Sequence, residues 1–213
     1  MELSIAQSIA DNVLKSISPF CHRSEIAGSI RRKKPEVKDI EIVARVNDWE
    51  GLFVSLQSHG IFIKSGVPDV QPWPPKKGAK YLRMMLHGEI KLDLFIANEH
   101  NWGALFMMRT GGATGPTGNP FEGFTPMMFA RWKRVSGGGR MMNCLPTLPD
   151  GRTVSVPEEE DFFKLCGCDW TPPEERISSS AIRKQRGYKL QIENFSFVNE
   201  KVTQQLALQL VAV

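Results

Sequence analysis

The sequence predicts an α+β fold in which helices cover one face of a mixed sheet. Residues 2–17 repeat an isoleucine or valine at every fourth position, which is typical of an amphipathic helix packed on a sheet. The segments 38–43 and 90–96 instead place polar and apolar residues on opposite faces, as half-buried strands do. A chain of 213 residues, 41% of them hydrophobic, can form one compact unit or two small ones around such elements.

The other elements follow from the same periodicities and from the positions of glycine and proline. A two-residue turn at Gly88-Glu89 should join the strand 81–87 to the strand 90–96 in a hairpin. The further expected elements, in chain order, are a helix over 48–58, a short strand over 61–65, a surface loop over 68–78, helices over 98–109 and 124–135, an antiparallel pair of strands over 141–145 and 153–156 around a turn at 149–151, and a helix over 158–166.

A candidate phosphate-binding segment begins at Gly28. Gly28 lets a ligand approach the backbone closely, and Ser29 adds a hydroxyl and a backbone N–H group. Four consecutive cations, residues 31–34, follow directly. Because N–H groups, hydroxyls and cations all bind phosphate oxygens, this segment suits a polyphosphate. Taken alone, the same residues also fit an ordinary turn.

Three carboxylates are candidates for a divalent-metal site. Asp39 and Glu41 share one face of the strand 38–43, and Asp93 projects from the strand 90–96. If the two strands are neighbours, the three carboxylates meet on one face of the sheet. Two Mg²⁺ ions roughly 3.5–4 Å apart need several such oxygens close together. For either strand alone, solvated surface acids are the alternative interpretation.

These motifs, taken together, resemble a known family. A Gly-Ser cradle, an Asp-x-Glu strand and a later strand with a single Asp, in this order, resemble the nucleotidyltransferase superfamily, and specifically the palm of family X DNA polymerases, the polymerase beta type. WGALFMMRTGG, residues 102–112, resembles the helix and Thr-Gly turn that flank the incoming nucleotide in that family. PEEEDFFKLCGCDWTPPEER, residues 157–176, resembles the end of its thumb domain.

The resemblance implies a domain organisation and an activity. A nucleotidyltransferase palm would span residues 1–110, a small α/β thumb would span 111–177, and residues 178–213 would form an extension of unknown role. No segment resembles the lyase and finger domains of larger relatives, so the form would be minimal. The implied activity is metal-dependent nucleotidyl transfer, as a DNA polymerase that fills gaps or repairs DNA by adding nucleotides to a primer 3′-hydroxyl with two Mg²⁺ ions, for which Mn²⁺ can substitute.

Site residues carry over from the family by their positions in the motifs. The resemblance makes Asp39, Glu41 and Asp93 the catalytic and metal-binding residues, with Glu41 in place of the commoner Asp. Met108 and Arg109 replace the aromatic pair that packs against the nucleotide sugar in the polymerases, so sugar selection should differ. The expected nucleotide-binding residues are Gly28, Ser29, Arg32, Met108, Arg109, Thr110 and Gly111.

The charge distribution favours a nucleic acid as partner. The formal net charge is only +4, but the cations gather in several clusters along the chain. A solvated surface explains any one cluster equally well. The expected partners are a DNA primer-template or gapped DNA and a nucleoside triphosphate. The DNA-binding candidates are Lys91, Arg131, Lys133, Arg134, Arg183, Lys184 and Arg186.

Cysteine usage and hydropathy bear on the compartment. The four cysteines follow no secretory signal and no disulfide spacing, which indicates a reducing compartment, the cytoplasm or wherever DNA is handled, rather than secretion. No apolar run reaches the roughly 18 residues that cross a membrane. Cys166 and Cys168 lack a second pair or a nearby histidine, so zinc is not expected.

Two other functions remain open. The chain could be a nucleotidyltransferase that modifies RNA or extends ends without a template, although the thumb resemblance argues against it. It could also be a catalytically silent module that binds DNA ends, although the intact set of three acids argues against that.

Overall fold

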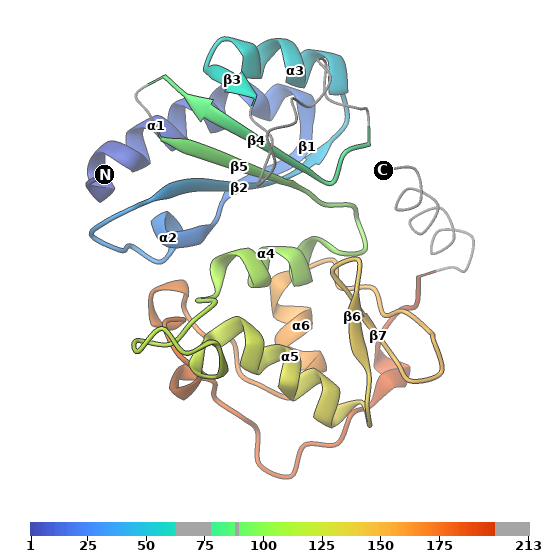
Figure 1. Cartoon of the computed structure of the whole chain (residues 1–213). Coiled ribbons are helices and arrows are strands. Elements are labelled where there is room, and N and C mark those ends of the chain that lie inside the picture. The colour runs from blue at the N-terminus through green and yellow to red at the C-terminus, as the bar shows by residue number, and fades with distance from the viewer. Residues whose placement is uncertain (63–77, 88–89, 199–213) are drawn as a thin grey trace. The chain divides into compact units, whose positions relative to one another are not determined.

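The computed structural model describes residues 1–62, 78–87 and 90–198 and has an α+β fold (Figure 1). The chain divides into two compact units, Met1–Ala97 and Asn98–Val213. The first unit contains a five-stranded sheet, and the second contains a two-stranded sheet among helices. Within the described ranges, no helix is both long enough and apolar enough to cross a membrane.

The sheet of the first unit is mixed. Its strand order is β1-β2-β5-β4-β3, in which β2 and β5 run parallel and all other neighbours run antiparallel. The parallel pair therefore lies at the centre, with antiparallel neighbours on both sides. The strands are β1 (Cys21–Ile26), β2 (Asp39–Val46), β3 (Gly60–Phe62), β4 (Tyr81–Leu86) and β5 (Lys91–Ile96).

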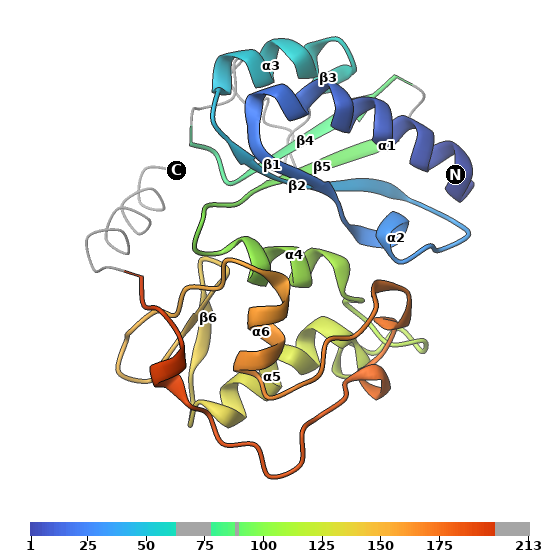
Figure 2. The same ribbon diagram turned by 180° about the vertical axis from the view of Figure 1, so that it is seen from behind.

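Two helices, α1 (Leu3–Ile17) and α3 (Trp49–Gln57), cover one face of this sheet (Figures 1 and 2). The Asp48 side chain caps α3 by accepting hydrogen bonds from two backbone N–H groups. The core between helices and sheet is formed by alternate strand residues and by the inward face of each helix, which include Val13, Ile17, Ile40, Ile42, Leu52, Leu56, Leu92 and Leu94. The short helix α2 (Gly28–Arg31) follows β1 and packs beside β2. The expected helices over 2–17 and 48–58 are thus confirmed.

The hairpin of β4 and β5 is confirmed, but its register differs from the expected one. Arg83 lies opposite Asp93, and the N–H of Leu86 donates to the carbonyl of Ile90 at 2.9 Å. Residues 88–89 lie outside the described part, yet this register separates the strands by three residues, 87–89, instead of two. A two-residue turn would have placed Met84 opposite Asp93. Because side chains alternate between the faces of a strand, a register shift of one residue decides whether Arg83 or Met84 lies beside Asp93.

The expected strand over 61–65 is described only in part. β3 begins at Gly60 and ends at Phe62, while residues 63–65 lie outside the described ranges. The same holds for the predicted loop at 68–77.

A side chain at position 60 would collide with the backbone of β4, because a Cβ built there lies 2.1 Å from the carbonyl oxygen of Met85.

In its described residues, the second unit packs three helices and a small hairpin around its own core. A buried tryptophan, Trp132, and two buried phenylalanines, Phe162 and Phe163, form the centre of that core. Its helices and strands are α4 (Trp102–Thr110), α5 (Phe124–Val135), α6 (Glu159–Leu165), β6 (Arg140–Met142) and β7 (Leu145–Thr147). Short 3₁₀ turns lie at Ser18–Phe20 in the first unit and at Pro120–Glu122, Pro173–Glu175, Ser179–Ala181 and Ile192–Asn194 in the second.

The hairpin of the second unit turns earlier than the sequence analysis predicted. β6 pairs with β7 through Asn143 and Cys144, which both have positive φ values (51° and 59°), as a two-residue hairpin turn requires. The predicted turn at 149–151 exists too, since the N–H of Leu148 bonds to the carbonyl of Arg152. It joins β7 to an isolated bridge at Thr153, so the predicted pairing of 141–145 with 153–156 was wrong. Asparagine tolerates positive φ, and this was the signal that the prediction missed.

The division between the units falls after Ala97 instead of after Thr110. Helix α4 belongs to the second unit, because its buried residues Ala104 and Met107 pack in that core. Residues 178–198 also pack on the second unit, where Ile182 and Val198 are buried. The apolar end of the chain, residues 199–213, lies outside the described part.

Candidate active site

The three predicted carboxylates lie on one face of the central parallel strands. Glu41 of β2 is the direct register partner of Asp93 of β5, and Asp39 is opposite Lys91. The intervening residues Ile40 and Leu92 point to the other face, into the core beneath α1 and α3. The expectation that the two strands are neighbours is therefore confirmed, and the strand register brings the three acids together.

The predicted phosphate cradle adjoins Glu41. Gly28 begins α2 with φ +64°, and a Cβ built on it would lie 2.1 Å from Oε2 of Glu41. Glycine is thus required twice, once by its left-handed conformation and once by the carboxylate against its Cα. The N–H of Ala27 donates to the carbonyl of Glu41 at 2.8 Å, which fixes the start of α2 beside β2.

Ser29 and Arg32 lie in the same short segment. The Oγ of Ser29 is buried and has no hydrogen-bond partner among the described residues. A buried hydroxyl without a partner costs roughly 1–3 kcal/mol, so a ligand that bonds to it would recover this free energy. Arg32 caps the C-terminal end of α2, and its N–H donates to the carbonyl of Gly28 at 3.2 Å. The segment therefore carries a buried hydroxyl without a partner directly after Gly28, the residue that adjoins Glu41.

A cation already compensates one of the three acids. Arg83 of β4 donates from Nε and Nη2 to the two oxygens of Asp93, at 2.6 and 2.7 Å, and Tyr81 donates from its hydroxyl to Oδ1 at 2.7 Å. Burial and the hydrogen bond to Asp93 raise the pKa of Tyr81, so its phenol keeps its proton and remains a donor. The hydrogen bond to Asp93 also raises the pKa of Arg83. Asp93 itself is only 5% exposed.

The acids suit a hard cation by chemistry, but they are not arranged as a ready site. Among the described residues, no group of three or more His, Cys, Asp or Glu side chains is placed to hold a metal ion. Both oxygens of Asp93 are engaged by Arg83. Carboxylate oxygens are the ligands that Mg²⁺ prefers, so the donor set fits the ion provided that Arg83 yields at least one oxygen.

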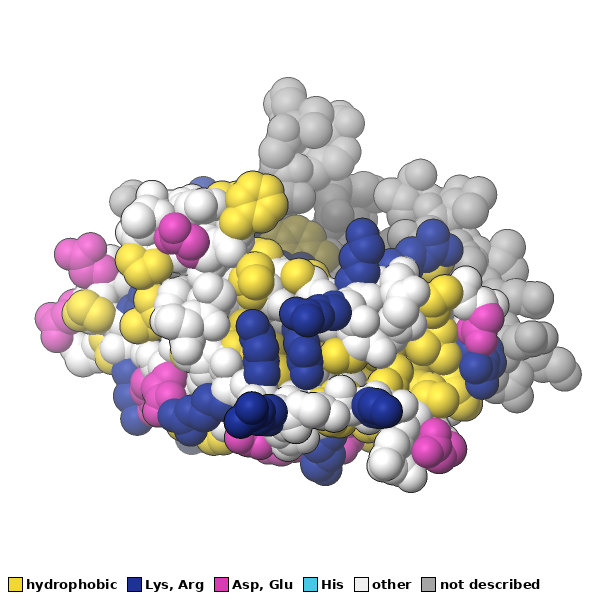
Figure 3. Space-filling model, turned by 90° about the horizontal axis from the view of Figure 1, so that it is seen from below, with side chains coloured by type: hydrophobic (Ala, Val, Ile, Leu, Met, Phe, Trp, Pro, Cys, Tyr) yellow, Lys and Arg dark blue, Asp and Glu magenta, His cyan; other side chains and the backbone are white. Residues whose placement is uncertain are grey.

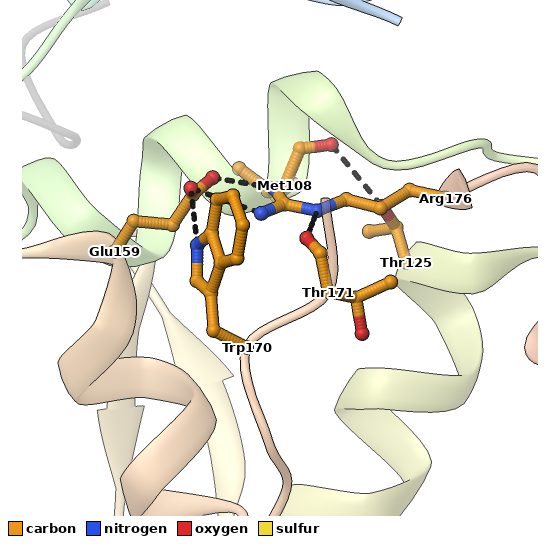
Figure 4. Close-up of polar contacts among 6 residues, drawn as sticks. All are labelled: Met108, Thr125, Glu159, Trp170, Thr171 and Arg176. Carbon is orange, nitrogen blue, oxygen red and sulfur yellow. Dashed lines mark hydrogen bonds and ion pairs between the residues drawn. The ribbon is translucent and has the colours of Figure 1, made fainter. Parts of the chain in front are cut away.

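The remaining nucleotide-binding candidates belong to the second unit. Met108, Arg109 and Thr110 form the last turn of α4, and Gly111 ends it with its N–H on the carbonyl of Met107 at 2.8 Å. The backbone of this turn is fixed, because Thr125 Oγ1 donates to the carbonyl of Met108 at 3.2 Å (Figure 4). These four candidates thus belong to the second unit, whereas the three carboxylates belong to the first.

A buried ion pair organises the second unit behind this turn (Figure 4). Arg176 has no exposed side-chain surface and donates to both oxygens of Glu159, at 2.5 and 3.0 Å. Its Nε donates to the carbonyl of Thr171, and Trp170 Nε1 donates to Glu159. The carbonyl of Arg176 accepts from the N–H of Gly112, so the pair also holds the chain that follows α4.

The DNA-binding candidates differ in how free their charges are. Arg183 pairs with Glu175, and Arg131 donates from Nε to the carbonyl of Cys166 at 2.8 Å. The other candidates are exposed, and they are Lys91 on the carboxylate face of β5 and, in the second unit, Lys133, Arg134, Lys184 and Arg186.

Sequence reasoning missed Tyr81 and Arg83, although both lie in a strand that it predicted. The signal was available in the alternation of β4, where Tyr81 and Arg83 share one face. The assumed two-residue turn placed Met84, from the other face, opposite Asp93. With a three-residue connection, an arginine opposite an aspartate on neighbouring strands would have been expected to pair with it.

Comparison with known proteins adds no relative that bears on this site. No protein-family model matches the chain, and no curated protein matches it. The resemblance to family X polymerases therefore stays a prediction from the motifs.

Proposed function

We propose that this chain is a metal-dependent nucleotidyltransferase, a minimal DNA polymerase of the family X type with a palm and a thumb, which adds nucleotides to a primer 3′-hydroxyl on gapped or primed DNA. The observation that carries the proposal is the register of the central strands. Glu41 lies directly opposite Asp93 on parallel strands, Asp39 shares their face, and Gly28 lies against the Glu41 carboxylate.

Each residue would have a defined part in the reaction. Asp39, Glu41 and Asp93 would hold Mg²⁺, which would lower the charge of the triphosphate, activate the 3′-hydroxyl and stabilise the pyrophosphate that leaves. Gly28 would let the triphosphate approach the backbone, while Ser29 would donate its buried hydroxyl to a phosphate oxygen. The guanidinium of Arg32 would compensate phosphate charge.

One observation supports the silent DNA-binding alternative. Arg83 occupies both oxygens of Asp93, as a residue would in a fold that kept the acid only for a structural ion pair. In that case the chain would bind DNA without transferring nucleotides. A nucleotidyltransferase without a template, or one acting on RNA, would need the same acids, so only the substrate separates it from the polymerase.

A primer-extension assay tests these functions against each other. A labelled primer is offered on a gapped template, alone as a single strand, and replaced by tRNA, each with Mg²⁺, with Mn²⁺ and with EDTA. Extension confined to the gapped template and abolished by EDTA supports the polymerase. Extension of the single strand or of tRNA assigns the other nucleotidyltransferase activity, and binding without any extension assigns the silent module.

A further inference from the structure

A groove in the second unit lies between α5 and the segment that follows Ile177. It has a volume of about 810 Å³, within the range of natural ligand sites. Its walls come from the C-terminal half of α5, the turn at 148–152 and the segment 185–192. We call it the cationic groove. All of its lining residues belong to the second unit, so it is separate from the carboxylates on β2 and β5.

The charge of the cationic groove is strongly positive. Arg131, Arg134, Arg152 and Lys189 line it together with a single carboxylate, Asp150. Asp150 is already paired with Arg152 at 2.8 Å, so it does not offset the other three cations. Arg134 and Lys189 are exposed, and within the described part their side chains make no hydrogen bond or ion pair. These two cations are therefore available to a bound anion.

Apolar side chains line the groove together with the cations. They are those of Val135, Leu148, Leu190 and Ile192. Figure 3 shows one face of the second unit on which several Lys and Arg side chains gather with hydrophobic side chains between them, while acidic side chains lie mainly toward the edges. A ligand that fits must therefore combine negative charges with apolar surface.

The wall that carries Lys189 is held in place. Tyr188 donates its hydroxyl to the carbonyls of Lys164 and Leu165, at 2.9 and 3.3 Å, and its ring lies against Gly167. The N–H of Gln185 donates to the carbonyl of Gly167 at 3.0 Å. A preorganised wall binds with less loss of conformational entropy than a free segment would.

We infer that the cationic groove binds a single strand of nucleic acid. Phosphates of the strand would lie along Arg131, Arg134 and Lys189, since residues three apart on a helix share a face. The bases would cover the apolar side chains, which a duplex could not do because its bases are stacked inside. The segment 185–192, in which Arg186 was the DNA-binding candidate, would thus form half of a binding site. This inference does not depend on nucleotidyl transfer.

Binding of a labelled oligo-dT, measured by fluorescence anisotropy in EDTA, tests the inference without any catalysis. The double variant Arg134→Ala/Lys189→Ala should weaken binding by more than about tenfold at about 0.1 M salt, and should lower the slope of log K against log salt by about 1.4, because each lost phosphate contact accounts for about 0.7 on a single strand. The matched control, Lys15→Ala/Arg140→Ala, removes two exposed cations outside the groove and should change binding less than about threefold. Arg134→Lys/Lys189→Arg should bind like the wild type.

Several results would overturn the inference. The first is wild-type affinity in Arg134→Ala/Lys189→Ala. The second is an equal loss of affinity in both alanine variants, because the loss would then reflect the lower net charge and not the groove. Equal competition by duplex DNA, by poly-glutamate, by ATP or by inorganic phosphate would assign the groove to another ligand. Photo-cross-linking of the unaltered chain to a bromouracil oligonucleotide is independent of variant folding. It should label peptides containing 131–136 and 185–192, and labelling elsewhere alone would contradict the inference.

Discussion

Arg83 and Asp93 lie directly opposite each other on β4 and β5, and the guanidinium donates to both carboxylate oxygens. This pair links the fold of the first unit to the proposed chemistry, because the same two oxygens would have to serve a metal ion. A buried carboxylate needs a cation beside it whether or not a metal ion is bound. On the proposed function, Arg83 and Mg²⁺ would therefore compete for Asp93.

Replacing Arg83 should make the stability of the protein depend on Mg²⁺. In Arg83→Met the Asp93 carboxylate keeps, among the described residues, the hydrogen bond from Tyr81 but no cation. The change should cost about 3–5 kcal/mol because a buried charge is left without its counter-ion. Binding of Mg²⁺ at about 100 times its Kd would return about 2.7 kcal/mol. Thermal unfolding with Mg²⁺ and with EDTA should thus show a larger difference for Arg83→Met than for the wild type. The variant Arg83→Met/Asp93→Asn is the control and should lose the Mg²⁺ effect, and equal effects in all three proteins would exclude Asp93 as a ligand.

Removing Asp39 should abolish nucleotidyl transfer with little effect on the fold. Asp39→Asn deletes one proposed metal-bound charge at the partly exposed end of β2, where no core contact is lost. Primer extension should fall below about a tenth of the wild-type rate at saturating Mg²⁺ while DNA binding remains. Asp11→Asn, on the exposed side of α1, is the matched control. Asp93→Asn should also stop transfer, but it breaks the pair with Arg83 and is the less clean test.

A side chain at position 28 should disturb the site through Glu41. Gly28→Ala places a Cβ 2.1 Å from Oε2 of Glu41 and adds strain of about 1–2 kcal/mol at φ +64°. Gly137→Ala has nearly the same conformation, φ +70°, with no atom within 4 Å of the new Cβ, so it reports the backbone strain alone. Transfer measured as kcat/KM should fall at least tenfold further in Gly28→Ala than in Gly137→Ala. Equal losses would mean that the cradle does not act on the carboxylate.

The turn at the end of α4 predicts weak selection against ribonucleotides. Met108 is an unbranched side chain that can move aside, and Arg109 can donate a hydrogen bond to a 2′-hydroxyl. A hydroxyl excluded only by soft packing is rejected by about 10²-fold or less. Single-nucleotide insertion on a gapped primer should show such a ratio of kcat/KM for dNTP over rNTP, and Met108→Tyr should raise it. A wild-type ratio above roughly 10³ would mean that the backbone, and not the Met108 side chain, excludes the 2′-hydroxyl. Thr125 fixes that backbone by its hydrogen bond to the Met108 carbonyl.

The buried pair of Glu159 and Arg176 should dominate the stability of the second unit. Arg176→Met removes the cation that pairs with the buried Glu159 carboxylate, which should cost about 3–5 kcal/mol. Arg183→Met breaks a solvent-exposed pair with Glu175 and should cost at most about 1 kcal/mol. Urea unfolding followed by tryptophan fluorescence measures both. Similar midpoints for the two variants would show that the buried pair contributes no more than a surface one.

The sequence determined the central features of the first unit well, because they depend on local periodicity. Asp39 and Glu41 share a strand face by alternation alone, and the order of motifs indicated that the Asp93 strand would be the neighbour. The register between β4 and β5 was harder to predict. A single extra residue between β4 and β5 decides whether Met84 or Arg83 faces Asp93, and this connection depends on residues whose turn type the sequence does not specify.

In the second unit, the prediction failed for features of the structure that depend on contacts between residues far apart in the sequence. The motif resemblance placed the residues of α4 in the first domain, but Ala104 and Met107 pack in the core that contains Phe162. Pro149-Asp150-Gly151 was read as the hairpin turn, although Asn143 provides the tighter one. The motif gave Arg176 no partner, and the fold shows that Glu159 and three aromatic rings surround it.

The packing of residues 178–198 has a practical consequence for shortening the protein. The N–H of Val198 donates to the carbonyl of Thr153 at 2.8 Å, and the side chains of Ile182 and Val198 are both buried. A fragment that stops at Ile177, where the motif resemblance ends, would present the apolar surface that these residues cover and would be prone to aggregate. A C-terminal tag or fusion partner should therefore be attached after Val198, and a protease that cuts within 178–198 should release a poorly soluble product.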